Sequence, residues 1–321
     1  MKPHIRVKSY VERKIEDICS FVRENIETVK IQTKGKKNDS LSPKELVSVI
    51  SNVMFQDLGF YGNVQEYYSP SNSFINSVLD KCSGIPITLS VLFKMIADRI
   101  GLETFPVSFP SHFLLGVKSK EEDFFIDSYN GGKILNKTDC QQMLEGSIEW
   151  SDEFLTEANF LLVYVRMLNN LVGIYREQDP VCFVNTLDLL YELAYTDEAR
   201  MEVSIMQIQT CLMVNLHQKA LETLQRSEVV SHLQIENVRQ LEKDIKEKLL
   251  REEVMVVKDS SKVEKEIKFK IGEIVVFSDV NHVVVGWDST PNISLFEFRH
   301  SRSSEPHYLI LPGFKFFNFM L

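Results

Sequence analysis

Three residues of this chain could together perform nucleophilic chemistry: Cys82, His112 and Asp127. In such an arrangement the carboxylate orients the imidazole, and the imidazole accepts the proton of the attacking thiol. The thiolate is favoured when the thiol stands at the N-terminus of a helix beside an imidazole, because the helix dipole and the ring both stabilise negative charge. The first question is therefore whether a helix places a thiol beside His112.

A helix is predicted between Gly84-Ile85-Pro86 and Gly101, and its start is where such a thiol would stand. Counting back from Gly101 by the usual helix length puts the position of the nucleophile at Pro86. Proline has no nucleophilic atom, and it suits the first position of a helix on structural grounds alone. Cys82 lies four residues before Pro86, which corresponds to about 6 Å along a helix axis.

From Pro86 we predict a protein that is not an enzyme, in which His112 and Asp127 remain as a structural pair. One charge-assisted hydrogen bond between such residues can hold two strands in register. His112 could also line a pocket without turnover. A looped path that returns Cys82 to His112 would instead give a thiol hydrolase or acyl-transferase. The predicted binding residues are Tyr67, Tyr68, Asn72, His112 and Trp287.

No metal or cofactor site is predicted. No two His, Cys or Asp residues have the spacing of metal ligands, and the sequence has no glycine-rich phosphate loop. The five cysteines are odd in number, widely spaced and without a CxxC pair, so neither a zinc ribbon nor a disulfide scaffold is expected. We therefore expect a reducing compartment, the cytosol or the nucleus.

Charge and hydropathy restrict the partners. The formal net charge of −9 argues against an overall binder of nucleic acid or of anionic membranes. No run approaches the roughly 18 apolar residues of a membrane span, and the first residues lack the apolar segment of a signal peptide. We therefore expect no membrane association.

Helices and three strands are predicted around the candidate residues. Apolar residues at helical spacing over 11–29 indicate an amphipathic helix, and Ser42-Pro43-Lys44-Glu45 has the pattern of a capping box. Ile87–Ile100 is apolar almost all round, which is typical of a buried helix. Phe105–Phe109, His112–Val117 and Asp123–Ser128 are predicted as strands, with His112 and Asp127 on the last two.

The second half of the chain is predicted to be helical and then β-structured. Four amphipathic helices indicate an antiparallel array similar to tetratricopeptide repeats; they are Phe160–Tyr175, Cys182–Leu193, Ala199–Val214 and His217–Leu224. The charge-dense segment Ile235–Glu266 is predicted as a linker helix with a hinge. Four short strands then indicate a small β-barrel or sandwich: Phe269–Phe277, His282–Trp287, Ser294–Arg299 and His307–Leu311.

These elements predict an α+β protein of four parts. We place a core at residues 1–135, a helical repeat-like tail at 136–230, a charged linker helix at 231–267 and a β module at 268–321. The aromatic end, Gly313–Leu321, is expected either to pack or to mark a truncated module.

The central motifs resemble the transglutaminase-like region of bacterial SirB-type proteins, whose fold is papain-like. The resemblance is carried by the runs Tyr67–Phe74, Gly84–Leu92, Ser108–Leu115, Ile126–Gly132 and Arg166–Leu171. It extends over roughly residues 45–225. It implies that a cysteine at the helix start, a histidine and an aspartate would be the catalytic residues of active relatives, so Pro86 again indicates a pseudoenzyme-like core.

The C-terminal motifs are similar to the YccV-like module, also called the hemimethylated-DNA-binding type. They are Phe269–Val275, Val285–Asp288 and Glu305–Tyr308. Together the two regions resemble the F-box only protein 21 family, which implies a substrate-recognition subunit of a cullin-type (SCF) ubiquitin ligase, with target proteins as partners. No F-box-like pattern precedes Val11, so we expect adaptor binding only if an F-box lies upstream.

The name of the C-terminal module suggests DNA binding, which its charge does not support. From Val254 to Leu321 the sequence has eight Lys or Arg residues and eight Asp or Glu residues. Affinity for duplex DNA depends largely on neutralising phosphates with a basic surface. Nucleic-acid binding is therefore the weakest of the three functional hypotheses, after protein recognition and thiol catalysis.

Overall fold

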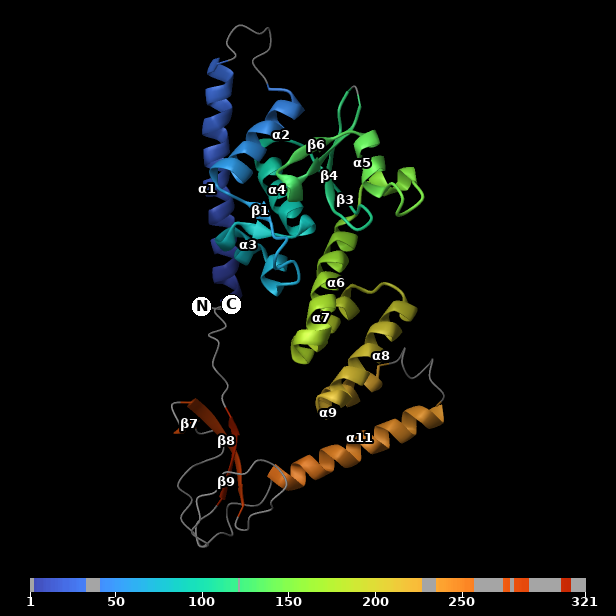
Figure 1. Ribbon diagram of the computed structural model, residues 1–321. Helices are drawn as coiled ribbons and strands as arrows, with labels where there is room; N and C mark the ends of the chain where they lie inside the picture. Colours follow the sequence, from blue (N-terminus) through green and yellow to red (C-terminus); the bar gives the residue numbers. More distant parts are fainter. Residues whose placement is uncertain are drawn as a thin grey trace. The chain divides into compact units, whose positions relative to one another are not determined.

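The computed structural model describes residues 3–32, 41–120, 122–226, 235–256, 274–277, 280–288 and 307–312 (Figure 1). These residues form two compact units, residues 1–206 and residues 207–320. The first unit contains the candidate residues Cys82, His112 and Asp127.

Helices form one side of the first unit. They are α1 (Pro3–Gln32), α2 (Pro43–Ser51), α3 (Ile75–Lys81) and α4 (Pro86–Ile100), with a π-helical segment at Asn52–Asp57. α1 buries the stripe that its sequence predicts, with Ile15, Cys19 and Val22 at 0% exposure. Its stripe packs in the same core cluster as Leu89, Leu92 and Phe93 of α4. The amphipathic pattern therefore correctly predicts this helix and its buried side.

The start of α2 confirms the predicted capping box. The Oγ atom of Ser42 accepts a hydrogen bond from the backbone N–H of Glu45 at 3.3 Å. In return, Oε2 of Glu45 accepts from the backbone N–H of Ser42 at 2.8 Å. Both bonds satisfy donors that a helix start would otherwise leave unpaired.

α4 is the central buried helix of the unit. Pro86 occupies its first position after the N-cap residue Ile85, and Gly101 ends it with a φ of +83°. Leu89, Leu92, Phe93 and Ile96 are all fully buried. The proline start, the glycine stop and the nearly continuous apolar surface are each as predicted, because all three are local properties of the sequence.

A four-stranded antiparallel sheet lies beside α4 (Figure 1). Its strands are β3 (Phe105–Val107), β4 (Leu114–Val117), β5 (Phe124–Asp127) and β6 (Lys133–Leu135), hydrogen-bonded in that order. Leu115 is paired with Ile126, and both belong to the core shared with α4. Leu114 and Phe125 are the strand neighbours of this pair, so their side chains lie on the other face of the sheet. They pack in a second cluster with α5 (Lys137–Leu144).

Two features of this sheet differ from the sequence prediction. His112 is not on a strand: its backbone N–H donates to the carbonyl of Phe109, Ser111 adopts a φ of +54°, and β4 begins only at Leu114. The chain thus turns before it enters the sheet. β6 was not predicted, because three residues after Gly131-Gly132 are too few for an alternating pattern.

A second, very small sheet lies beside the start of α4. β1 (Tyr61–Gly62) and β2 (Ser83–Gly84) pair in parallel, with Gly62 opposite Gly84. This pairing brings the segment before α4 next to the loop that leads to Tyr67. A 3₁₀ turn at Pro70–Ser73 then connects this loop to α3.

The helical tail of the first unit begins with α6 (Phe160–Gln178) and α7 (Pro180–Leu193). Phe183 and Leu187 of α7 pack against Leu168 and Val172 of α6 in one cluster. α8 (Asp197–Met213) and α9 (His217–Leu224) follow along the chain. All four helices were predicted within a few residues, whereas the tetratricopeptide-like arrangement remains a prediction.

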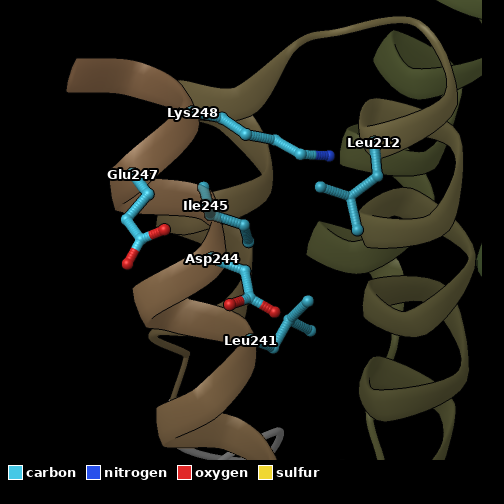
Figure 2. A pocket seen from close by; sticks show the side chains of 6 residues that line it. All are labelled: Leu212, Leu241, Asp244, Ile245, Glu247 and Lys248. Carbon is cyan, nitrogen blue, oxygen red and sulfur yellow. The ribbon is translucent and has the colours of Figure 1, made fainter. Parts of the chain in front are cut away.

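The second unit contains α9, α11 (Ile235–Val256) and a three-stranded antiparallel sheet. The sheet strands are β7 (Ile274–Phe277), β8 (Val280–Asp288) and β9 (His307–Pro312). The predicted strand Ser294–Arg299 lies outside the described residues, and the barrel interpretation remains a prediction. α11 lines a cavity of about 330 Å³ that includes Leu212, Leu241 and Ile245 (Figure 2).

Among the described helices, none combines the length and the apolar character that crossing a bilayer requires. α4, the most apolar of the helices around the sheet, has only 15 residues. A span needs about 20.

Candidate functional site around His112 and Asp127

His112 and Asp127 form a direct side-chain pair. The Nε2 atom of His112 lies 2.9 Å from Oδ1 of Asp127. Asp127 is the last residue of β5, and His112 lies in the turn that leads into the neighbouring strand β4. The side chains are 14% and 3% exposed, respectively. The sequence therefore correctly predicts that these two residues meet, although it places His112 on the strand rather than before it.

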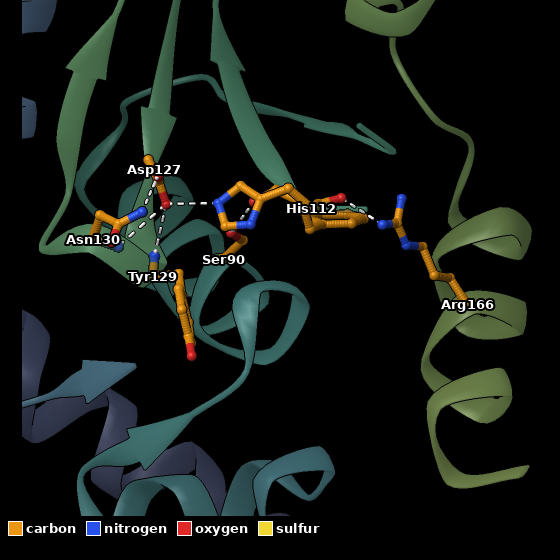
Figure 3. Close-up of polar contacts among 7 residues, drawn as sticks. Ser90, His112, Asp127, Tyr129, Asn130 and Arg166 are labelled. Atoms are coloured by element: carbon orange, nitrogen blue, oxygen red, sulfur yellow. Dashed lines mark hydrogen bonds and ion pairs between the residues drawn. The ribbon is translucent and has the colours of Figure 1, made fainter. Parts of the chain in front are cut away.

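Asp127 is held by four donors (Figure 3). Its Oδ1 atom accepts from His112 and from the backbone N–H groups of Tyr129 and Asn130, and its Oδ2 atom accepts from Nδ2 of Asn130 at 2.6 Å. Burial by itself raises the pKa of Asp127, but the hydrogen bonds from His112 and Asn130 outweigh it and lower the pKa below its usual value. Asp127 is thus an ionised carboxylate at neutral pH.

The charge of Asp127 fixes the tautomer of His112. An ionised carboxylate only accepts hydrogen bonds, so the proton of a neutral imidazole must be on Nε2. Nδ1 is then the atom with the free lone pair. Among the described residues, Nδ1 has no hydrogen-bond partner, and Figure 3 shows this side of the ring directed toward α4 and Ser90. The pair therefore has the orientation that a general base requires.

A row of aromatic rings leads from His112 to the surface. The ring of Tyr129 lies edge-on to His112 at 6.0 Å, and Tyr67 lies edge-on to Tyr129 at 6.4 Å. Tyr68 contacts Tyr67 at 5.3 Å and is 73% exposed. Gly62 is needed here, because a Cβ atom at this position would lie 2.5 Å from a ring carbon of Tyr129. We call Tyr68, Tyr67, Tyr129 and His112 the aromatic row.

Asn72 supports this row from inside the protein. It is 1% exposed, and its Nδ2 atom donates to the carbonyls of Glu66 and Tyr67. Its Oδ1 atom accepts from Nδ2 of Asn63, and its own carbonyl accepts from Oγ1 of Thr88 on α4. The sequence predicts Asn72 as a binding residue, but its burial favours a role in fixing the turn that carries Tyr67 and Tyr68.

The start of α4 carries a buried proline. Pro86 follows Ile85 at the positive end of the helix. An apolar cluster surrounds this end and joins Ile85 and Ile87 to Phe113 and to Val163 of α6. Tyr67 and Met167 pack against the same cluster. The helix start thus contacts the tail helix α6, a relationship for which the sequence gives no signal.

Cys82 lies at the end of α3 in the left-handed conformation, with a φ of 51°. Its carbonyl accepts from the backbone N–H of Tyr61 at 2.9 Å, and its side chain packs against the main core. Burial raises the pKa of the Cys82 thiol; Asp80 raises it further to a smaller extent, and Lys14 lowers it. Within the described residues, no hydrogen bond joins Cys82 to His112. The contacts of Cys82 are thus with β1 and the main core.

Arg166 of α6 contacts the turn before β4, and its role at the site was not predicted. Its Nη1 atom donates to Oγ of Ser108 at 2.8 Å and to the carbonyl of Phe109 at 2.9 Å, and its Nη2 atom donates to the carbonyl of His112. The guanidinium also lies 5.6 Å from the centre of the Phe113 ring. The sequence feature that could have indicated this role is an arginine that stands between the apolar positions 163 and 167 on one face of a helix.

Trp287 is the remaining predicted binding residue. It lies on β8 in the second unit, paired with Tyr308 of β9. Its binding role remains a prediction. Over the residues that the structure describes, no group of three or more His, Cys, Asp or Glu side chains could hold a metal ion.

The sequence of the part of the chain that contains His112 and Asp127 matches a known family. Residues 10–169 match the family described as the Transglutaminase-like superfamily. This part of the chain, which includes Cys82, Pro86, His112 and Asp127, is therefore a transglutaminase-like domain.

Particular relatives are distant. A protein described as a UPF0162 protein from Xylella fastidiosa is 31% identical over 180 residues, which cover 54% of this chain and 57% of that protein. F-box only protein 21 of Pongo abelii is 27% identical over 310 residues, which cover 88% of this chain and 49% of that protein. The human F-box only protein 21 is also 27% identical, over 212 residues. This chain thus spans about half the length of the first two relatives.

No solved structure is significantly similar to this chain. The similarity to F-box only protein 21 and to the UPF0162 proteins therefore comes from sequence alone. The YccV-like interpretation of residues 268–321 remains a prediction.

Proposed function

We propose that this chain is a protein-recognition scaffold, the substrate-recognition subunit of a ubiquitin ligase, and not an enzyme. The similarity to F-box only protein 21 supports the ligase part of this proposal. The partners would be target proteins for ubiquitination. Contact with a cullin adaptor is proposed only for a form that has an F-box upstream of the region described.

The single observation that carries the proposal is Pro86 at the first position of α4. The helix start is where a transglutaminase-like enzyme of the cysteine type would place its thiol, and proline supplies no nucleophile. Val163 and Met167 of α6 pack in the cluster that includes Ile85 and Ile87 at this helix start. Side chains from the tail thus occupy the space beside the position of the missing thiol, which supports a domain used for binding.

The aromatic row is the surface that we propose for recognition. Tyrosine is enriched in protein interfaces because it offers a large apolar area and one polar atom at a small entropic cost. Tyr68 is 73% exposed, Val64 in the same loop is 76% exposed, and Tyr61 of β1 is 57% exposed. Asn72 holds this loop rigidly from behind through the carbonyls of Glu66 and Tyr67. A preorganised loop with exposed apolar side chains fits a partner polypeptide.

The second candidate function is a thiol hydrolase or acyl-transferase. The intact His112–Asp127 pair favours it, since Nδ1 of His112 is in the orientation of a general base. Cys82 is the candidate thiol. Its left-handed backbone and its raised pKa are unfavourable for this role, because a nucleophilic cysteine needs a lowered pKa.

The scaffold hypothesis can be tested on the full chain. We would express tagged wild type and variants in cells in which the proteasome is inhibited, and measure the polyubiquitinated protein that co-purifies. Tyr68→Ala and His112→Ala should reduce this amount several-fold, whereas Cys82→Ser should leave it unchanged. Tyr195→Ala is the control, because Tyr195 is 85% exposed and lies outside the aromatic row.

The enzymatic hypothesis predicts a different result for Cys82→Ser. The purified chain should then hydrolyse a model amide or thioester, and Cys82→Ser should abolish this activity. Such a result would overturn the scaffold proposal. If Tyr68→Ala and the wild type co-purified equal amounts of polyubiquitinated protein, the aromatic row would not be the recognition surface.

A further inference from the structure

We propose that Arg166 is a positioning residue for His112, and that it makes the first tail helix, α6, part of the His112–Asp127 site. The predicted core ended at residue 135, before this helix begins. The proposal does not depend on whether the site binds a partner or performs catalysis.

Arg166 binds one short turn at three points. Its guanidinium donates to the side chain of Ser108, to the carbonyl of Phe109 and to the carbonyl of His112. The turn is thus held at its beginning and at the residue that carries the imidazole. The guanidinium carbon also lies over the ring of Phe113, the next residue along the chain, at 5.6 Å from the ring centre.

The turn needs this support because it has little of its own. Two backbone bonds are made within it, from Phe109 to the carbonyl of Val107 and from His112 to the carbonyl of Phe109. Ser111 is in the left-handed conformation, which is unfavourable for a residue with a Cβ atom. Such conformations persist where surrounding contacts hold them in place. Arg166 supplies these contacts on both sides of Ser111.

The charge of Arg166 fits this role. Among the described residues, no carboxylate lies within ion-pair distance of Arg166, so its acceptors are the two carbonyls and the hydroxyl of the turn. Arg166 is partly buried, and this burial lowers the pKa of its guanidinium. A partly buried cation is costly unless its N–H groups are satisfied. The planar guanidinium donates to three acceptors at once. The ammonium group of a lysine, on a flexible side chain, cannot reproduce this geometry well.

The experiment measures the accessibility of His112 in the full chain. Diethyl pyrocarbonate modifies free imidazole nitrogen, and peptide mass spectrometry gives the rate at each histidine separately. We expect Arg166→Gln to raise the rate at His112 about ten-fold, as for the loss of one hydrogen bond from a charged donor to a locally opening segment. Arg166→Lys should give an intermediate rate. Arg176→Gln is the matched control, an exposed arginine on the same helix.

A second probe separates a local effect from unfolding. Cys140 is fully buried in the cluster behind the sheet, so its alkylation rate reports on the stability of the whole unit. Faster modification of His112 with unchanged protection of Cys140 supports the proposal. An unchanged rate at His112 in Arg166→Gln would overturn it, and so would a parallel rise at His112 and Cys140. Equal rates in the Gln and Lys variants would also contradict it.

Discussion

Nε2 of His112 and Oδ1 of Asp127 are 2.9 Å apart, although fifteen positions separate the two residues in the chain. Asp127 accepts three further hydrogen bonds, all from Tyr129 and Asn130. The carboxylate therefore links the turn before β4 to the turn after β5. Its charge state should affect both stability and the orientation of the imidazole.

The first prediction concerns stability against pH. Hydrogen bonds lower the pKa of Asp127 in the folded protein, whereas the unfolded value is about 3.9. A group with a depressed folded pKa stabilises the fold above its unfolded pKa, and this stabilisation disappears as the pH falls through the folded value. The wild type should thus lose more stability than Asp127→Asn between about pH 5 and pH 2, measured by urea unfolding.

At neutral pH the same variant should be less stable. Asp127→Asn replaces an acceptor of four hydrogen bonds by a group that also donates, at a cost of about 1–3 kcal/mol. Asp123→Asn is the control: Asp123 is exposed and accepts one backbone hydrogen bond from Ser119. Its change should be within about 0.5 kcal/mol. Equal effects of the two variants would contradict the assigned role of Asp127.

The second prediction concerns the thiols. Burial raises the pKa of Cys82, and it raises that of Cys140 to about 12. Even at the unperturbed value of about 8.5, a thiol is less than about 1% thiolate at pH 6. Labelling of Cys82 by iodoacetamide at pH 6 should therefore be slow and should increase with pH, without a fast phase.

Cys182 is the control for this measurement. It is also partly exposed, and burial likewise raises its pKa. Cys82 and Cys182 should react at comparable rates, and His112→Ala should change neither. A fast reaction of Cys82 at pH 6 that His112→Ala abolishes would indicate an active thiol–imidazole pair.

The third prediction concerns two adjacent glycines after Asp127. Gly131 and Gly132 both have a φ near +75°. A Cβ atom at Gly131 would meet open space, whereas one at Gly132 would clash with the side chains of Ser51 and Phe55. Gly131→Ala should thus cost only the left-handed strain of about 1–2 kcal/mol.

Gly132→Ala should cost more, because overpacking adds about 1–3 kcal/mol to the same strain. Urea unfolding of both variants gives the comparison directly. The two residues share a backbone conformation, so the difference between them isolates the clash with Ser51 and Phe55. Similar stabilities would show that Ser51 and Phe55 move aside without cost.

The fourth prediction concerns the capping box of α2. Ser42→Ala removes the side-chain acceptor for Glu45 and should cost about 1 kcal/mol. Ser48→Ala is the control on the same helix, since Oγ of Ser48 donates only to the carbonyl of Lys44 one turn earlier. That variant should be within about 0.5 kcal/mol of the wild type. A loss at Ser48 as large as at Ser42 would contradict the capping account.

Local patterns in the sequence predict the helices well. The capping box at Ser42, the proline start of α4 and the glycine stop at Gly101 each depend on residues only a few positions apart. The prediction that His112 meets Asp127 also holds, because neighbouring antiparallel strands place residues near their ends side by side. These features need no knowledge of distant contacts.

Other features were decided by contacts between distant residues. Arg166 reaches the turn at Ser108 and His112 across 58 and 54 positions, and Val163 packs with Ile85 and Ile87. Such contacts leave no local pattern, since the arginine and its carbonyl acceptors carry no shared periodicity. By itself the sequence determined the helices, the proline at the start of α4 and the identity of the histidine–aspartate pair. The tertiary structure alone decided how α6 holds His112 and packs at the start of α4, because only folding brings these segments together.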